Sequence, residues 1–407
     1  MATALSWPVS HTESRVTSLP RRILNRAIDE FAIHRCVLGQ SATATPSEVH
    51  TSKRWVTRKM GGNSLMGLRV FGSRLAGSEE LNWCNTRKIV FLIYFVLLAN
   101  AVHAAGVREL MIPADLHGPQ ILARLWTPCA APPGQIKVES GPLRVTVRGV
   151  KDCPPLGKGL PLILISHGMF GDMFSHHDTA EFLADAGFAV VTLNHTLDSV
   201  SSAKDKSPYD ISSFLVRPVD IKRAIDFILT NSQVPVDIDS RRIGFFGFSR
   251  GGYTGLVLAG AVPDFHAPPS PCPEELLMCK QMRDNNVPAY SSGYESRIKA
   301  FVIADPLSFF PDKASLRRVT APIQLWSSDH GGDGVRPEDV ASIKTNLPTP
   351  PEFHRPTNSG HFSFLFPCSK EAAKAVPYVC TDSPGFNREV FHKELNIKIL
   401  DFLRKNL

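Results

Sequence analysis

One serine lies in a pattern that is typical of a catalytic nucleophile. Residues 247–252 read Gly-Phe-Ser-Arg-Gly-Gly, so Ser249 is the central residue of a G-x-S-x-G motif. An apolar strand over 243–246 is expected before it, and a helix of small residues over 252–261 after it. A nucleophile elbow requires this context, because glycines allow a sharp turn and the N-terminus of the helix faces the developing oxyanion. The motif predicts that Ser249 attacks a carbonyl carbon.

A second motif lies upstream, at the end of the expected strand over 160–166. Residues 166–171 read Ser-His-Gly-Met-Phe-Gly. A loop in this position supplies the second oxyanion donor of hydrolases that carry an elbow. We therefore predict that the backbone N–H groups of Met169 and Arg250 form the oxyanion hole. His167 is expected to shape the loop and not to act as a base.

His361 is the predicted general base. It lies in Ser-Gly-His-Phe-Ser-Phe, residues 359–364, after the apparent last strand and before a terminal helix. The chain order serine, acid, histidine is the order found in hydrolases with an elbow. Such a histidine takes the serine proton and returns it to the leaving group. Six other histidines are weaker candidates. His176, His177 and His195 precede the serine, and His330 and His354 lie outside a comparable Gly-His turn. His392 falls in the terminal helix, where a surface position is expected.

Three aspartates compete for the role of the acid. Asp305 ends the expected strand over 298–304 and precedes a proline, and Asp329 and Asp333 follow the next strand in a glycine-rich loop. Neighbouring strands can present a carboxylate to one imidazole, so each is a candidate. An aspartate before proline also starts turns, and glycine-rich loops are commonly solvated. We favour Asp305 and keep Asp329 and Asp333 as alternatives.

The surrounding periodicity predicts an α/β fold with a mostly parallel sheet and helices on both faces. Apolar runs such as Leu-Pro-Leu-Ile-Leu-Ile-Ser suit strands that are buried on both sides. A Pro/Gly loop is expected between residues 127 and 143. Residues 263–296 interrupt the pattern, and we interpret them as a cap insert that shapes an acyl pocket. The remaining expected strands are 120–127, 143–149, 188–193 and 321–326, and the remaining helices are 178–186, 219–229, 337–347 and 390–403.

The N-terminal third contains a segment typical of export. Arg87 and Lys88 precede an apolar run over 89–98, and small residues follow, so residues 86–104 are expected to form a signal peptide cleaved after Ala101 or Ala104. The alternative is a membrane anchor over 89–107. Residues 1–85 are basic and lack periodicity, which predicts a disordered extension. Because signal peptides normally start a protein, we expect a downstream start, at Met60, at Met66 or at a non-Met codon.

Composition narrows the class of protein further. The chain has 407 residues, of which 43% are hydrophobic, enough for a buried core in the domain expected over 105–407. Its net charge of +7 comes mostly from the first 90 residues, so a nucleic-acid partner is not expected. No cysteine or histidine pattern has zinc spacing, so no metal is expected. After the signal, the cysteines fall into three local pairs that an oxidising compartment would allow to bond: Cys129 and Cys153, Cys272 and Cys279, and Cys368 and Cys380.

Four motifs together resemble the α/β-hydrolases described as predicted dienelactone hydrolases, and are similar to platelet-activating-factor acetylhydrolases. They are SHGMFG, GFSRGG, ADPLSFF and GHFSFLFPC, within residues 107–407. The acetylhydrolase pattern implies Asp305 as the acid, whereas the usual hydrolase pattern places the acid after the next strand. Dienelactone hydrolases use a cysteine where this chain has Ser249, which points to ordinary ester hydrolysis. The family implies no metal and no cofactor.

The sequence therefore predicts an exported serine hydrolase that acts on small-molecule acyl esters. A serine peptidase on the same fold and a non-catalytic binding module remain alternatives. The acyl chain, the alcohol and the oligomeric state stay open at this point. Membrane association is expected only if the segment over 89–107 is not cleaved.

Overall fold

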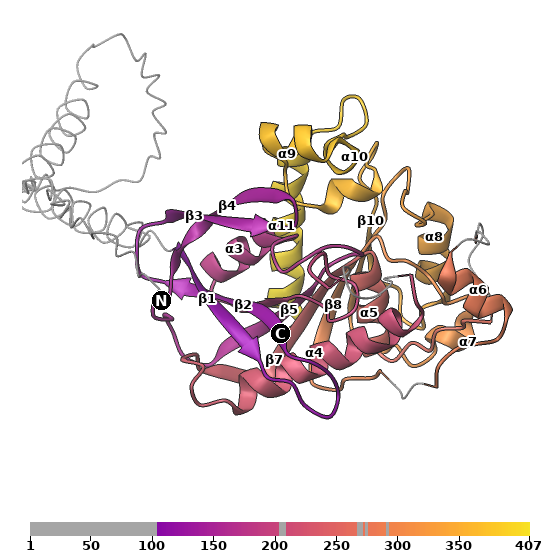
Figure 1. Ribbon diagram of the computed structural model, residues 1–407, viewed down its shortest axis with the longest axis horizontal. Helices are drawn as coiled ribbons and strands as arrows, with labels where there is room; N and C mark the ends of the chain where they lie inside the picture. The colour runs from indigo at the N-terminus through magenta and orange to yellow at the C-terminus, as the bar shows by residue number, and fades with distance from the viewer. Residues whose placement is uncertain (1–103, 203–208, 267–271, 273–275, 290–292) are drawn as a thin grey trace, which may run out of the picture. The chain divides into compact units, whose positions relative to one another are not determined.

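The computed structural model describes residues 104–202, 209–266, 272, 276–289 and 293–407 (Figure 1). The chain divides into two units, Met1–Asn100 and Ala101–Leu407, and all described residues belong to the second. The expected N-terminal extension and most of the expected signal peptide lie outside the described residues.

The described residues of the second unit contain a ten-stranded open sheet with the strand order β10-β9-β8-β7-β5-β6-β2-β1-β4-β3. The pairs from β10 to β6 are all parallel, whereas β2 pairs antiparallel with both β6 and β1. Every residue of β5 is buried, as its continuous apolar sequence predicts for a central parallel strand. The strands are β1 (Ala104–Ile112), β2 (Ile121–Cys129), β3 (Gly134–Ser140), β4 (Leu143–Lys151), β5 (Leu160–Ser166), β6 (Ala189–Leu193), β7 (Ile238–Phe248), β8 (Ile298–Ala304), β9 (Ile323–Trp326) and β10 (Glu352–His354).

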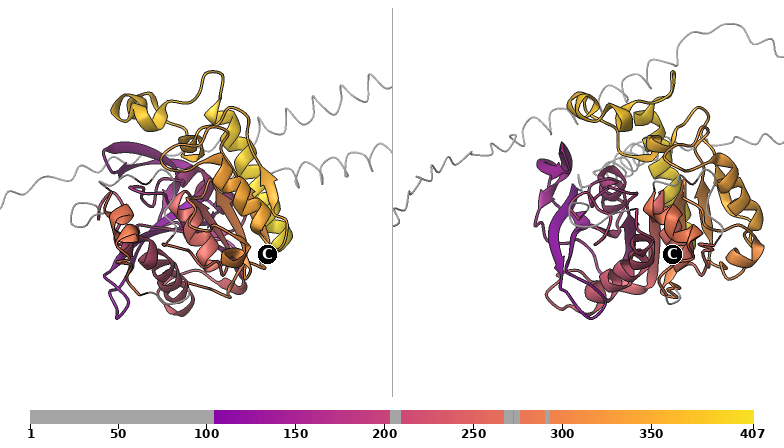
Figure 2. Two further views of the ribbon diagram at one scale, coloured as in Figure 1. Left: turned by 90° about the vertical axis from the view of Figure 1, so that its right-hand side faces the viewer. Right: turned by 45° about the vertical axis from the view of Figure 1, so that its right-hand side comes forward.

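Helices cover both faces of the sheet, as Figures 1 and 2 show. Successive residues of β7 point to opposite faces, so Phe245 belongs to one hydrophobic core and Phe246 to the other. The core around Phe245 includes residues of α4 (Ser212–Thr230) and α5 (Arg250–Leu258), and the core around Phe246 includes residues of α3 (His177–Asp185) and α11 (Arg388–Asn406). The smaller helices are α6 (Leu277–Arg283), α7 (Lys313–Leu316), α8 (Pro337–Asn346), η1 (His361–Phe364), α9 (Lys370–Ala375) and α10 (Pro377–Cys380).

The structure corrects two expectations about the first strands. Strand β3 occupies the region where a Pro/Gly loop was expected, and pairs with β4 along its whole length. Strand β1 begins at Ala104 and pairs with β2 from Ala104 to Ile112. Residues 104–107 therefore belong to the sheet, so a membrane segment that extends to residue 107 is wrong in its last four residues. A signal cleaved after Ala101 leaves β1 intact.

The three local cysteine pairs are disulfide-bonded: Cys129 with Cys153, Cys272 with Cys279, and Cys368 with Cys380. Disulfides persist in oxidising compartments, so this pairing agrees with export. Among the described residues, no helix has the length and apolarity needed to cross a bilayer.

Candidate active site

The turn between β7 and α5 presents Ser249 in a rarely populated backbone conformation, with φ 56° and ψ −115°. Its N–H donates to the carbonyl of Ala304 on the neighbouring strand at 3.0 Å. A Cβ on Gly247 would lie 2.1 Å from the carbonyl oxygen of Gly251, and a Cβ on Gly251 would lie 1.9 Å from that of Ser166. Only glycine fits at these two positions, so the glycines of the motif are required by close backbone approach. The expected strand-turn-helix geometry is present.

His361 begins η1 and lines the same cavity as Ser249. Its Nδ1 lies 2.6 Å from Oδ2 of Asp305, and this carboxylate also accepts hydrogen bonds from the N–H (2.6 Å) and the hydroxyl (2.8 Å) of Ser328. The ring of Phe248 stacks on the imidazole, with 4.6 Å between centroids. The Nε2 atom is buried and has no hydrogen-bond partner among the described residues. The imidazole is therefore held by one nitrogen, which leaves Nε2 available to another group.

The structure brings Asp305 to His361 and engages one of the other two candidate acids elsewhere. Asp329 forms an ion pair with Arg355 at 3.0 Å and accepts a hydrogen bond from the N–H of Asn358 at 2.9 Å. Asp333 lines the cavity. Ser328, which holds the Asp305 carboxylate, was not anticipated from the sequence. The only signal for it is a polar residue two positions after the end of β9, at the edge where neighbouring strands end.

The loop that follows β5 places Met169 in the cavity wall, beside Gly168 and Phe170. Phe170 has φ 55°, and its N–H donates to the carbonyl of Asp198 at 3.0 Å. His167 is buried, with Nδ1 at 2.6 Å from the carbonyl of Gly168. Burial and the nearby charge of Arg217 lower the pKa of His167, which keeps its ring neutral. Its contacts are those of a residue that shapes the loop.

His392 is not on the surface, contrary to expectation. Its exposed fraction is 3%, and its ring bridges Asp178 (2.6 Å) and the carbonyl of Ser363 (2.9 Å). The helix α11 turns this residue toward α3 and η1, and the polar face of the helix is therefore partly buried. Periodicity alone underestimates such positions, because a buried histidine with two partners looks like a surface residue in sequence.

The cavity has a volume of about 500 Å³ and is mostly apolar. Its walls come from the β3–β4 turn, the loop after β5, and the segment after η1. The described residues of the insert over 263–296 do not line it, so the expectation that this insert shapes the pocket is not met by the part that the structure describes. The larger side chains that line the cavity, apart from Phe248, are those of Leu143, Met169, Phe170, Tyr209, Phe362, Leu365, Phe366 and Tyr378.

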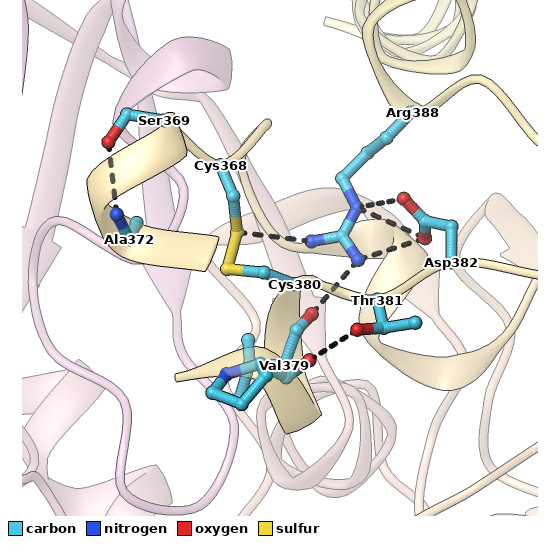
Figure 3. Close-up of a disulfide and its surroundings, with 9 residues drawn as sticks. Cys368, Ser369, Ala372, Val379, Cys380, Thr381, Asp382 and Arg388 are labelled. Atoms are coloured by element: carbon cyan, nitrogen blue, oxygen red, sulfur yellow. Dashed lines mark hydrogen bonds and ion pairs between the residues drawn. A yellow bond between two sulfur atoms is a disulfide. The ribbon is translucent and has the colours of Figure 1, made fainter. Parts of the chain in front are cut away.

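One wall of the cavity is formed by residues 365–380, which we call the C-terminal strap. Figure 3 shows the disulfide of this strap and the residues around it. The disulfide between Cys368 and Cys380 closes the strap into a loop that contains α9 and α10. Arg388 on α11 fastens it from outside, by an ion pair with Asp382 (2.9 Å) and a hydrogen bond to the carbonyl of Val379 (2.9 Å). A covalent link and a buried arginine therefore both hold this wall in position.

Among the described residues that line it, the cavity has acidic side chains but no lysine or arginine. Asp172 and Asp333 are both lining residues, and burial raises the pKa of Asp172. Burial also raises the pKa of Tyr378, whose ring packs edge-on against Phe362 with 5.0 Å between centroids. No group of histidines, cysteines or acids suited to a metal ion occurs in the part of the chain that the structure describes.

The fold and the position of the elbow define the architecture as that of an α/β-hydrolase. A ferulic acid esterase from Streptomyces cinnamoneus superposes with a TM-score of 0.52 at 15% identity, over 76% of this chain and 91% of that one. This likeness, at so low an identity, establishes the fold and not the reaction.

Two further solved structures are less similar. A protein described as a putative dipeptidyl aminopeptidase IV from Bacteroides ovatus has a TM-score of 0.43 at 14% identity, over 75% of this chain and 36% of that one. A dienelactone hydrolase from Anabaena variabilis has a TM-score of 0.38 at 16% identity, over 68% and 94%. No protein-family model matches the sequence, and no curated protein matches it either.

Proposed function

We propose that this protein is a serine hydrolase of carboxylic esters. The observation that carries the proposal is the Asp305–His361 hydrogen bond of 2.6 Å, beside a cavity that Ser249 and His361 both line. The buried Nε2 of His361 has no partner among the described residues. A carboxylate on Nδ1 fixes the tautomer in which Nε2 accepts a proton. Nε2 is then the atom that takes the proton from Ser249.

In this mechanism the hydroxyl oxygen of Ser249 attacks the ester carbonyl, and His361 receives the proton. The N–H groups of Met169 and Arg250 stabilise the oxyanion of the tetrahedral intermediate, an effect worth roughly 10²–10³ in kcat per donor. His361 then protonates the departing alcohol, which leaves an acyl group on Ser249. Water, activated by His361, hydrolyses this acyl-enzyme and restores the serine.

The first test is covalent labelling with a fluorophosphonate. We expect Ser249 to be labelled, and the Ser249→Ala variant to lose both labelling and hydrolysis of p-nitrophenyl acyl esters, by about 10⁴–10⁶-fold in kcat. A folded wild-type protein that neither reacts nor hydrolyses any ester would instead favour a binding module. Cleavage of peptide amides at rates similar to esters would favour a peptidase.

We also propose that the mature protein is exported. The three disulfides support this, because such bonds are rare in reducing compartments. N-terminal sequencing of the native protein tests it: the expected mature chain starts just after Ala101 or Ala104. A mature chain that begins near Met1 would contradict both the export signal and the downstream start.

A further inference from the structure

Behind the elbow lies a buried ionic cluster that the proposed mechanism does not use. Asp198 stands between two arginines: the Arg217 Nη1 atom lies 2.6 and 2.7 Å from its two carboxylate oxygens, and the Arg250 Nη1 atom lies 3.3 Å from one of them. All three side chains are at most 3% exposed. Although burial disfavours its charge, the two guanidinium groups lower the pKa of Asp198 to about 2. The cluster is therefore ionised, with two positive charges and one negative charge.

One arm of this cluster reaches the elbow. Arg250 follows Ser249 directly, and its side chain is fixed by Asp198, by the hydroxyl of Ser213 at 3.1 Å, and by the ring of Phe214 at 4.3 Å. The Arg217 Nε atom donates to the hydroxyl of Thr254 at 3.1 Å, and that hydroxyl donates to the Arg250 carbonyl at 2.8 Å. The two hydrogen bonds of the Thr254 hydroxyl set the orientation of the first turn of α5, where the Arg250 N–H lies.

The other arm reaches the loop after β5. The Arg217 Nη2 atom donates to the carbonyl of His167 and, at 3.2 Å, to the hydroxyl of Ser166. The backbone carbonyl of Asp198 accepts from the N–H of Phe170, the residue after Met169, at 3.0 Å. The same two residues, Asp198 and Arg217, thus hold the peptide segments on both sides of the Met169 N–H.

We propose that Asp198 and Arg217 are positioning residues, which set the separation of the two oxyanion donors, the N–H groups of Met169 and Arg250. This inference rests on the proposed function, since it concerns the same intermediate. A displacement of about 1 Å in a group that binds the transition state can cost roughly 10²-fold in rate. Loss of the cluster should therefore reduce turnover with little change in substrate binding.

The test compares Asp198→Asn and Thr254→Val with the wild type. We expect kcat per fluorophosphonate-labelled site to fall about 10- to 100-fold in Asp198→Asn and about 3- to 10-fold in Thr254→Val, with KM changed less than about threefold. Affinity for an aryl trifluoromethyl ketone, which mimics the tetrahedral adduct, should fall in parallel with kcat. Counting labelled sites removes any contribution from unfolded protein.

Glu295→Gln is the matched control, because Glu295 is also a buried acid paired with an arginine, Arg297, at 2.6 Å, and its side chain contacts neither the loop after β5 nor the elbow. It should lower stability and leave kcat per labelled site unchanged. If Asp198→Asn does not fold, Thr254→Val decides the question alone.

Two results overturn the inference in distinguishable ways. If the wild type hydrolyses esters and the folded variants keep kcat within about twofold, the positioning role is wrong and the proposed function stands. If the wild type neither labels nor hydrolyses esters, both are wrong.

Discussion

Four residues around the cavity have positive φ angles, which residues other than glycine rarely adopt. Ser249, Asp305, Phe170 and Asp333 have φ of 56°, 45°, 55° and 48°. Each such residue costs of order 1–3 kcal/mol and persists only where its surroundings enforce it. At Ser249 and Asp305 the enforcement is visible in the close packing of the elbow and the two hydrogen bonds from Ser328. Stability has been given up here for the placement of particular side chains.

The acid of the proposed mechanism can be tested by single substitutions. We expect Asp305→Asn to lower kcat by about 10⁴-fold, because the imidazole loses the carboxylate that fixes its tautomer. Asp329→Asn should stay within a few-fold of the wild type, since Asp329 pairs with Arg355. Steady-state kinetics on a p-nitrophenyl ester measure kcat for Asp305→Asn, Asp329→Asn and Asp333→Asn, the variants of the three candidate acids. A near-normal rate in Asp305→Asn, with a large loss in either of the others, would move the role to that residue.

His176 is a buried residue whose charge state links the fold to pH. Neither of its ring nitrogens has a hydrogen-bond partner among the described residues, and its ring packs against Phe246 and Phe248 with centroids 5.0 and 5.5 Å away. Burial lowers its pKa from 6.5 to about 3 in spite of the nearby Asp178. The folded protein therefore keeps this ring neutral over a range in which the unfolded chain binds a proton.

This difference in pKa between the folded and unfolded states predicts that His176 makes the free energy of unfolding depend on pH, and that the His176→Phe substitution removes this contribution. Between the unfolded pKa of 6.5 and the folded pKa of about 3, the unfolded chain binds more protons at this site, so the free energy of unfolding falls as the pH falls. The slope from His176 should approach about 1.4 kcal/mol per pH unit below its unfolded pKa. Denaturant unfolding of the wild type and of His176→Phe from pH 7 to pH 4 measures it. The curve of His176→Phe should be flatter by that amount; parallel curves would contradict the prediction.

At the scale of elements, the site consists of two parts that different segments of the chain form. The sheet and α5 carry the elbow, whereas the C-terminal strap and the β3–β4 turn build the cavity wall. The strap contains only the short helices α9 and α10, so it depends on the Cys368–Cys380 disulfide and on Arg388 for its shape. Changes in the strap should therefore act on substrate binding more than on chemistry.

Removal of that disulfide tests this division. We expect Cys368→Ser/Cys380→Ser to raise KM for long-chain esters several-fold, with kcat for acetate esters close to that of the wild type. The free energy of unfolding should fall by about 2–3 kcal/mol, as for the loss of a short cross-linked loop. Kinetics on esters graded by acyl length and thermal unfolding measure the two effects.

Cys272→Ser/Cys279→Ser is the control, because neither cysteine lines the cavity. It should lower stability without changing the acyl-length profile. An identical profile for both double variants would show that the strap does not select the acyl chain.

Local signals predicted the elements that carry the elbow, and failed where long-range contacts decide. Strand β7, the elbow and α5 follow from residues adjacent in sequence, because glycine spacing and an apolar run are local. Strand β3 was missed although Ile136 and Val138 alternate with exposed polar residues, since prolines and glycines flank it. The strap was missed as a pocket wall because nothing in its periodicity indicates that it lines the same cavity as Ser249.

For the site residues, motif context predicted His361 and favoured Asp305 without excluding Asp329 or Asp333. The structure adds that the Asp305 carboxylate lies 2.6 Å from the Nδ1 atom of His361. Ser328 and the cluster around Asp198 have no motif. Their roles depend on pairs far apart in sequence, such as Arg217 with Ser166, and these become visible only in three dimensions.

At the scale of the whole molecule, the first described strand lies at the end of the predicted export signal. Strand β1 starts at Ala104, and Val107, Leu110 and Ile112 are buried in the two cores. Burying such side chains contributes about 1.5–3 kcal/mol each, which together is comparable to the whole stability of a typical domain. The strand should be indispensable, and the residues before it dispensable, for folding of this unit.

Two truncated chains test this boundary. We expect residues 102–407 to match the full chain in melting temperature and in ester hydrolysis. Residues 113–407, which lack β1, should unfold at least about 10 °C lower or fail to fold, since one edge of β2 loses its partner. Thermal unfolding monitored by circular dichroism distinguishes them. A stable 113–407 fragment would contradict the role given to β1.

The strap leaves the body of the protein after η1 and returns to it at α11, with its two ends joined by sulfur. A segment attached in this way can be exchanged as one unit, because neither Ser249 nor His361 belongs to it. We expect that exchange of this one cross-linked loop would change the substrate preference of this protein, while Ser249 and His361 stay unchanged.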